Sequence, residues 1–199
     1  MKKINIFGAV SCKSRGMKLN FDLDLLRRKT KNRSPNYQQT VFWILSRKDS
    51  EDATPALADH VIISINGPDD DAPAAVKRNS YTKGVLVLHF DDLDEEVGPS
   101  FRRVYGRDVV LFDEEHAAQV HKFVKDADVK HVVVHCHMGV SRSAAVGAAL
   151  SVWLNGHDKG FHGYRRGLHP RDTYVYAQRC LTPNAYVRRV LLDYLMQQE

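Results

Sequence analysis

The chain has few of the features that mark secreted or membrane proteins. It has three cysteines, Cys12, Cys136 and Cys180, which are too few for a disulfide framework and lack the paired spacing of a metal site. No apolar run is long enough for a membrane-spanning helix. The apolar stretch after Lys2 and Lys3 is short and is soon followed by further basic residues, so we expect no export signal. These absences favour a protein of the reducing cytoplasm, without membrane contact.

The sequence also contains no internal repeat and no low-complexity tract. Its 199 residues, 43% hydrophobic and 27% charged, are typical of a globular protein. The length predicts a single domain over residues 1–199, with a basic N-terminal extension at residues 1–35. The formal net charge is +5, and basic residues crowd both ends. They could attract an anionic partner, although a solvated surface is the favoured interpretation for the N-terminal charges.

Apolar runs alternate with helical patterns along the chain. Four apolar runs predict strands at residues 41–45, 60–65, 84–90 and 130–135, and the continuous apolar character of the first two predicts burial on both faces of a sheet. A weaker alternation suggests a strand at residues 3–7. Helices are expected after the N-cap Asp113, over residues 143–154, and from Thr182 with Pro183 in the first turn. This order predicts an α/β fold with a central, mainly parallel sheet flanked by helices.

The most informative segment joins the fourth strand to the helix that follows it. Residues 132–143 read Val-Val-Val-His-Cys-His-Met-Gly-Val-Ser-Arg-Ser. The thiol of Cys136 thus begins a short loop, and the guanidinium of Arg142 ends it. Loop amides and the positive end of a helix attract a dianion, and Arg142 can bind two of its oxygens as a fork. The same field favours the thiolate form of Cys136, which is a nucleophile.

This His-Cys-x5-Arg-Ser segment resembles the signature of the cysteine-dependent protein tyrosine phosphatase superfamily. Its Gly-Val-Ser-Arg-Ser form is most similar to dual-specificity phosphatases, including small bacterial and phage-type members. The resemblance implies a Cys-x5-Arg loop between strand and helix. It also implies a protein phosphatase that hydrolyses phosphotyrosine, and possibly phosphoserine and phosphothreonine, through a phosphocysteine. No metal and no other cofactor is expected, and the partner would be a phosphorylated protein.

The resemblance also implies roles for single residues. Cys136 would be the nucleophile, Arg142 a phosphate ligand, and Ser143 the hydroxyl that assists release of the thiolate. His135 would orient the loop and help to keep the thiol ionised. Gly139 is expected to adopt a positive φ or to permit a close approach of the phosphate. Phosphate would be bound by Arg142 together with the loop amides of His137, Met138, Gly139, Val140 and Ser141.

A general acid is expected just after the third strand, where the resemblance points to adjacent aspartates. Strand register favours Asp92, Asp91 is the alternative, and Asp94 is the next to test. The gap between these residues and the signature is longer than in the family, and we assign the extra length to residues 95–111. The carboxyl ends of parallel strands lie at one edge of a sheet, so the acid and the Cys136 loop should share that edge.

Two other functions stay open. An RNA 5′-phosphatase or triphosphatase would share the loop, and a basic, aromatic stretch near the C-terminus could bind nucleic acid, although a surface loop with core tyrosines is the favoured interpretation. That stretch contains Tyr174, Tyr176 and Tyr186 with Arg165, Arg166, Arg171 and Arg179. A phosphopeptide-binding module without catalysis is the other alternative, but such a module would be expected to lack the Cys, the Arg or the acid.

Overall fold

The computed structural model describes residues 39–52, 58–70, 78–94, 106–161, 175–177 and 180–198. The basic extension and the strand expected at residues 3–7 lie outside these ranges. In chain order the elements are β1 (Val41–Ser46), α2 (Arg47–Asp52), β2 (His60–Asn66), β3 (Thr82–His89), α4 (Glu114–Ala127), β4 (His131–Cys136), α5 (Arg142–Asn155), β5 (Val175–Ala177) and α6 (Ala185–Gln197).

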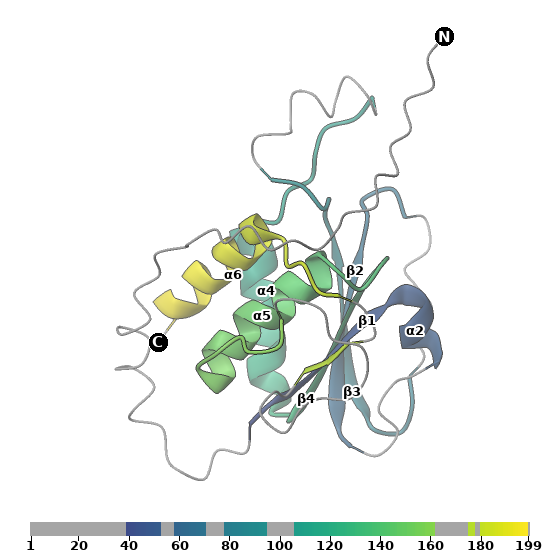
Figure 1. Cartoon of the computed structure of the whole chain (residues 1–199), viewed down its shortest axis with the longest axis vertical. Coiled ribbons are helices and arrows are strands. Elements are labelled where there is room, and N and C mark those ends of the chain that lie inside the picture. Colours follow the sequence, from purple (N-terminus) through teal and green to yellow (C-terminus); the bar gives the residue numbers. More distant parts are fainter. Residues whose placement is uncertain are drawn as a thin grey trace.

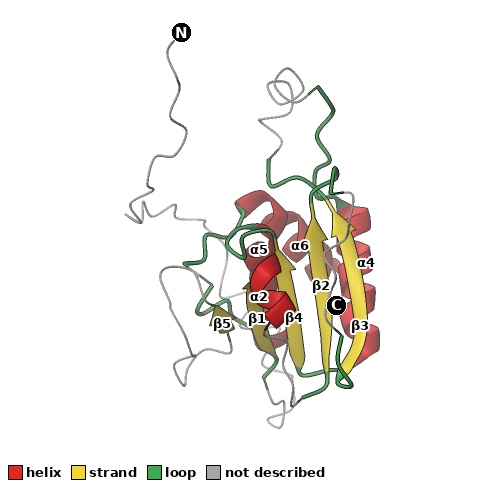
Figure 2. Ribbon diagram, turned by 90° about the vertical axis from the view of Figure 1, so that its right-hand side faces the viewer, coloured by secondary structure: helices red, strands yellow, loops and turns green. Residues whose placement is uncertain are grey.

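The strands form one sheet in the order β3-β2-β4-β1-β5, and every pairing is parallel. Helices α4, α5 and α6 cover one face of this sheet, whereas α2 lies on the other face (Figure 1). Seen from the α2 side, the sheet separates this short helix from the other three (Figure 2). The predicted α/β fold with a central parallel sheet is therefore confirmed.

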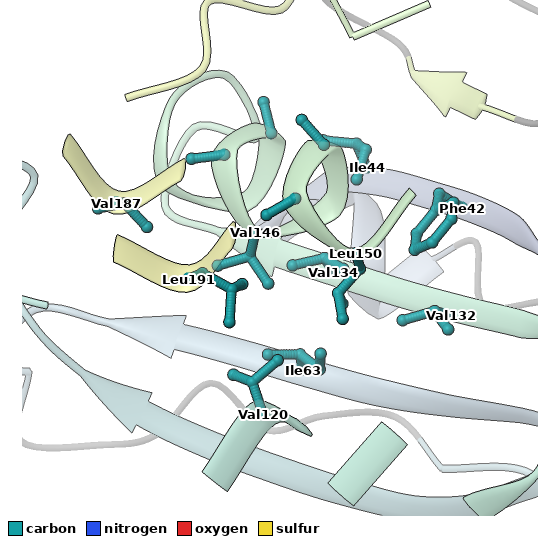
Figure 3. Close-up of a cluster of buried hydrophobic side chains, with 14 of the residues drawn as sticks. Phe42, Ile44, Ile63, Val120, Val132, Val134, Val146, Leu150, Val187 and Leu191 are labelled. Carbon is teal, nitrogen blue, oxygen red and sulfur yellow. The ribbon is translucent and has the colours of Figure 1, made fainter. Parts of the chain in front are cut away.

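The main core lies between the sheet and the helices α4, α5 and α6. Strand residues Phe42, Ile63 and Val134 meet Val146 of α5 and Leu191 of α6 there (Figure 3). Helix α5 packs on β4 and β1 and is covered on its other side by α6. Because it is enclosed on both sides, α5 is buried over almost its whole circumference and is apolar all round, without an amphipathic stripe.

The four predicted strands are present, with ends that differ by one or two residues. The predicted cap of α4 is observed, because Asp113 caps that helix. Helix α5 ends at Gly156, which is left-handed at φ 76°. The cap predicted for the last helix is wrong. Asn184, not Thr182, caps α6, and its side chain accepts from the Val187 amide. Asparagine caps as well as threonine does, so sequence alone favours neither.

The chain changes direction between β1 and β4, which are neighbours in the sheet. From β1 the chain enters α2 on one face, and from β4 it enters α5 on the opposite face. The two strands end level with each other, because Ser46 pairs with Cys136 in the register. A crevice at such a switch point is the usual ligand site of a parallel sheet. The loop that begins at Cys136 occupies this position.

Candidate active site

Cys136 is the last residue of β4, and its side chain faces the helical layer. The residue is 2% exposed, and its Sγ has two polar neighbours. The Gly139 amide donates to Sγ over 3.3 Å, and the Ser143 hydroxyl lies 3.2 Å from Sγ. Donors at this distance stabilise sulfur best when it carries negative charge. The Gly139 amide and the Ser143 hydroxyl are therefore both placed to donate a hydrogen bond to Sγ.

Gly139 is where the loop packs against the sheet. Its φ is +69°, as predicted, a conformation that L side chains adopt with difficulty. A β-carbon built on Gly139 would lie 2.4 Å from the Ser46 nitrogen and 2.5 Å from the Leu45 carbonyl carbon. Here the close approach is to the backbone at the end of β1, which cannot yield as a flexible side chain could. Glycine is required for both reasons.

The carbonyl groups of the loop are engaged outside it. His137 O accepts from the Arg47 amide, Val140 O from the Thr182 amide, and Ser141 O from the Ala145 amide. In a trans peptide the C=O and N–H point in opposite directions, so each outward carbonyl turns the next N–H inward. The amides turned inward in this way belong to Met138, Ser141 and Arg142. Amides turned in this way would make the concave side of the loop rich in donors, an arrangement of the kind that binds anions.

Arg142 leaves one edge of its guanidinium unused. Its Nη1 donates to Asn66 O over 3.1 Å and to Phe90 O over 2.8 Å, which ties α5 to the ends of β2 and β3. Its Nε is buried and has no partner within the described part of the chain, and no partner is found there for Nη2. Together Nε and Nη2 form the edge with which arginine binds two oxygens of one anion.

Asp91 has a structural environment. It is 8% exposed and accepts hydrogen bonds from Arg107 Nη1 and Nη2, over 2.8 and 2.7 Å. Its Oδ2 also accepts from the Val110 amide over 2.9 Å. The Arg107 hydrogen bonds, helped by the Val110 amide, hold the pKa of Asp91 below its usual value of 3.8, although burial opposes this. A carboxyl group that is held ionised in this way has no proton to donate at neutral pH.

Asp92, one residue later, is exposed and lies against the Cys136 loop. Its Oδ1 accepts from the Ser141 hydroxyl over 2.7 Å and from Asn184 Nδ2 over 3.0 Å. Ser141 occupies the N-cap position of α5, yet its side chain makes no capping bond and is directed to Asp92 instead. The structure thus brings Asp92, and not the ion-paired Asp91, beside the loop with an available carboxyl group.

His135 lies on the sheet face opposite to Cys136, because successive side chains of a strand alternate. The residue is fully buried, and neither ring nitrogen has a hydrogen-bond partner in the described structure. Burial, with a smaller contribution from the charge of Arg47, lowers the pKa of His135 to about 4. The ring is therefore neutral at physiological pH and contributes no positive charge near Cys136.

Two functional neighbours were missed by the sequence reasoning. The side-chain amide of Asn184 contacts Asp92. Arg107 forms ion pairs with both Asp91 and Asp69. Neither contact has a local sequence signal, because the partners lie far apart in the chain.

Several other sequence predictions concern the rest of the chain. Tyr176 stacks on Trp43 at 4.1 Å between ring centroids, in agreement with a structural tyrosine. The remaining members of the basic, aromatic stretch before residue 175, and Arg179, lie outside the described residues. Within the described ranges, no three His, Cys, Asp or Glu side chains come together as a metal site. No helix in those ranges is both long and apolar enough to cross a membrane.

We predict that Gly139→Ala abolishes anion binding by the loop. The new β-carbon would have to displace the β1 backbone, and the left-handed φ adds further strain. Calorimetric titration with inorganic phosphate should show at least a tenfold loss of affinity, since the inward amides must move by more than a hydrogen bond tolerates. Unchanged phosphate affinity in a folded Gly139→Ala protein would contradict the assignment.

Asp91→Asn should lower the free energy of unfolding at pH 7 by about 1–3 kcal/mol, because it breaks a largely buried charged pair. The pKa of Asp91 is lowered on folding, so its ionised form stabilises the protein above pH 3.8, and this is lost as the pH falls through the lowered pKa. The difference from wild type in urea unfolding should therefore shrink in strong acid. Asp92→Asn, at the exposed neighbour, serves as the control and should leave stability nearly unchanged. Equal losses in the two variants would show that this contrast is wrong.

Comparisons with known proteins add little to this geometry. No family model matches the chain, and no curated protein matches it. Among solved structures, the chain is similar to the crystal structure of the human tyrosine phosphatase-like serine/threonine/tyrosine-interacting protein. The match has 20% sequence identity and a TM-score of 0.36, and it covers 71% of this chain and 78% of the other. A likeness of this degree does not extend to activity or substrate.

Proposed function

We propose that this protein is a phosphomonoesterase that works through a phosphocysteine on Cys136. The observation that carries the proposal is the unused guanidinium edge of Arg142, with its buried Nε, at the end of a loop whose amides face inward. These donors, which have no partners in the described structure, belong to the loop that begins at the buried thiol of Cys136. A tetrahedral dianion would satisfy them, and few other ligands would satisfy both the fork and the amides.

In the first step the Cys136 thiolate attacks phosphorus. The S–P bond forms while the ester P–O bond breaks, and the electron pair of that bond goes to the leaving oxygen. Protonated Asp92 gives its proton to this oxygen, while Arg142 and the loop amides hold the three equatorial oxygens. Asp91 does not take this role in our proposal, because Arg107 holds it as a buried carboxylate.

In the second step water hydrolyses the phosphocysteine. The water oxygen attacks phosphorus and passes a proton to Asp92, so the acid of the first step becomes the base of the second. The S–P bond breaks and its electron pair returns to Cys136. The Ser143 hydroxyl, 3.2 Å from Sγ, is placed to donate a hydrogen bond as charge returns to sulfur. Each group is restored, and phosphate and alcohol are the products.

We favour phosphoprotein substrates, phosphotyrosine first, over RNA ends. A triphosphate needs several free cations near the loop. Two further arginines of the described structure lie at this edge, and both are paired: Arg47 with Asp70, and Arg107 with Asp69 and Asp91. Arg142 is thus the cation with an available edge in the described site. A phosphomonoester needs no cation beyond this arginine.

Cys136→Ser should abolish turnover of aryl phosphates and phosphotyrosine peptides but keep measurable phosphate binding, because a hydroxyl has the shape of the thiol and is a far weaker nucleophile.

Arg142→Lys should lower kcat/KM by about a hundredfold or more, since an ammonium cannot form the two-oxygen fork. Turnover is followed by phosphate release and binding by calorimetry. Binding without turnover in the wild-type protein would favour the phosphopeptide-binding module instead. Higher kcat/KM on 5′-triphosphorylated RNA than on any phosphopeptide would overturn the substrate choice.

Asp92→Asn should slow hydrolysis of alkyl phosphates by about a hundredfold while affecting activated aryl phosphates much less, because only the poor leaving group needs a proton. The measurement is kcat over a series of leaving groups of rising alcohol pKa. Asp91→Asn is the matched control and should retain the wild-type slope once its lower stability is allowed for. If the slope changes with Asp91 instead, the acid is assigned one residue too late.

A further inference from the structure

Asn184 connects the start of α6 to both parts of the proposed site. Its backbone amide donates to Ser141 O over 3.4 Å, and its own carbonyl accepts from the Arg188 amide over 3.1 Å. Its side-chain Oδ1 accepts from the Val187 amide over 3.1 Å, and its Nδ2 donates to Asp92 Oδ1 over 3.0 Å. Its Nδ2 also donates to Leu93 O over 3.5 Å. Every polar group of this residue is therefore engaged, and two of its five bonds reach Ser141 and Asp92.

The orientation of the amide group is fixed by chemistry. The atom that caps α6 must be an acceptor, because the Val187 amide is a donor, so the oxygen occupies that position. The NH2 group is then the atom that faces Asp92. A flipped amide would set two donors against each other at Val187 and an oxygen against a carboxyl oxygen at Asp92. The Asn184 side chain thus uses its oxygen as an acceptor to cap α6 and its NH2 group as a donor to Asp92.

This arrangement leaves one oxygen of Asp92 available. Asn184 Nδ2 and the Ser141 hydroxyl both donate to Oδ1, and within the described residues Oδ2 has no partner. Two donors on Oδ1 disfavour a proton there, so a protonated Asp92 carries its proton on Oδ2. The same two bonds also restrict rotation of the carboxyl group. The exposed aspartate therefore presents a defined oxygen.

We propose that Asn184 is a positioning residue that holds the Asp92 carboxyl group over the Cys136 loop, with Oδ2 as the oxygen that gives and takes the proton. This inference deepens the proposed function and rests on it. Asn184 does not contact the reacting atoms; it acts through Asp92. Because it is also the cap of α6, the stability of that helix and the placement of the acid depend on one side chain.

Substitutions at Asn184 can separate the capping of α6 from the hydrogen bond to Asp92. Asn184→Ser and Asn184→Asp both keep an oxygen that can cap α6, but neither has the NH2 donor. Asn184→Asp also places a second carboxylate beside Asp92. Asn184→Ala removes both the cap and the donor. The readouts are the thermal midpoint, the ratio of kcat for activated aryl phosphate to kcat for alkyl phosphate, and the pH profile of kcat/KM.

If Asn184 positions the acid, the aryl-to-alkyl ratio should rise about tenfold in all three variants, a fraction of what a general acid contributes. The thermal midpoint should fall only in Asn184→Ala. In Asn184→Asp the limb on which activity declines with rising pH should move to higher pH, because the added negative charge disfavours ionisation of the acid. In the Asp92→Asn background, Asn184→Ser should not change the ratio further.

A wild-type ratio in Asn184→Ser, or an equal rise of the ratio in the Asp92→Asn background, would overturn the inference and leave Asn184 as a helix cap only. The proposed function fails separately. Turnover that survives Cys136→Ser would remove the phosphocysteine, and an unchanged leaving-group slope in Asp92→Asn would remove the acid. If both of those variants behave as proposed and Asn184→Ser does not, the positioning role alone is wrong.

Discussion

The site depends on the two hydrogen bonds from Arg142 Nη1 to Asn66 O and Phe90 O. Arg142 opens α5, and its two acceptors lie at the ends of β2 and β3, so these bonds join the helix to strands further along the sheet. Phe90 O lies just past the end of β3, whereas Asn66 O, at the end of β2, accepts from the Phe90 amide as well as from Arg142. By using one nitrogen here, the arginine is held rigidly while its other edge stays available for a ligand.

Charge at this edge is divided between a frame of ion pairs and a centre that lacks a partner. Asp69, Asp70 and Asp91 are paired with Arg47 and Arg107, so both of these arginines are already engaged by carboxylates. His135 is neutral because burial lowers its pKa to about 4. The inward amides of the loop and the open edge of Arg142 are donors, and the exposed Asp92 lies beside them as the proposed acid. An anion is the ligand that such a centre lacks.

The sequence predicted the elements whose signal is local. Strands β1 to β4 are continuous apolar runs, and the Cys136 loop was expected from the contrast between such a run and the polar residues after it. Elements that depend on distant partners were missed. β5 is three residues long and depends on β1, where Tyr176 stacks on Trp43. The sequence placed the cap of α6 at Thr182, whereas Asn184 caps this helix. Asn184 also contacts Asp92, which is 92 positions away in the chain and gives no local signal. The choice between Asp91 and Asp92 stayed open for a similar reason, since Arg107 gives no local signal.

The adjacent aspartates show why burial and chemistry are divided between neighbours. Asp91 is fixed on every side: its amide donates to Val110 O, its carboxylate accepts from the Val110 amide, and Arg107 binds both of its oxygens. That fixation holds the backbone at the point where the chain leaves β3. The next residue, Asp92, is exposed and is directed to the loop, where Ser141 and Asn184 contact one of its oxygens. A group that exchanges protons needs solvent access and a defined position. Asp92 has solvent access because its side chain is exposed. Its position is defined because the buried Asp91 fixes the backbone that precedes it.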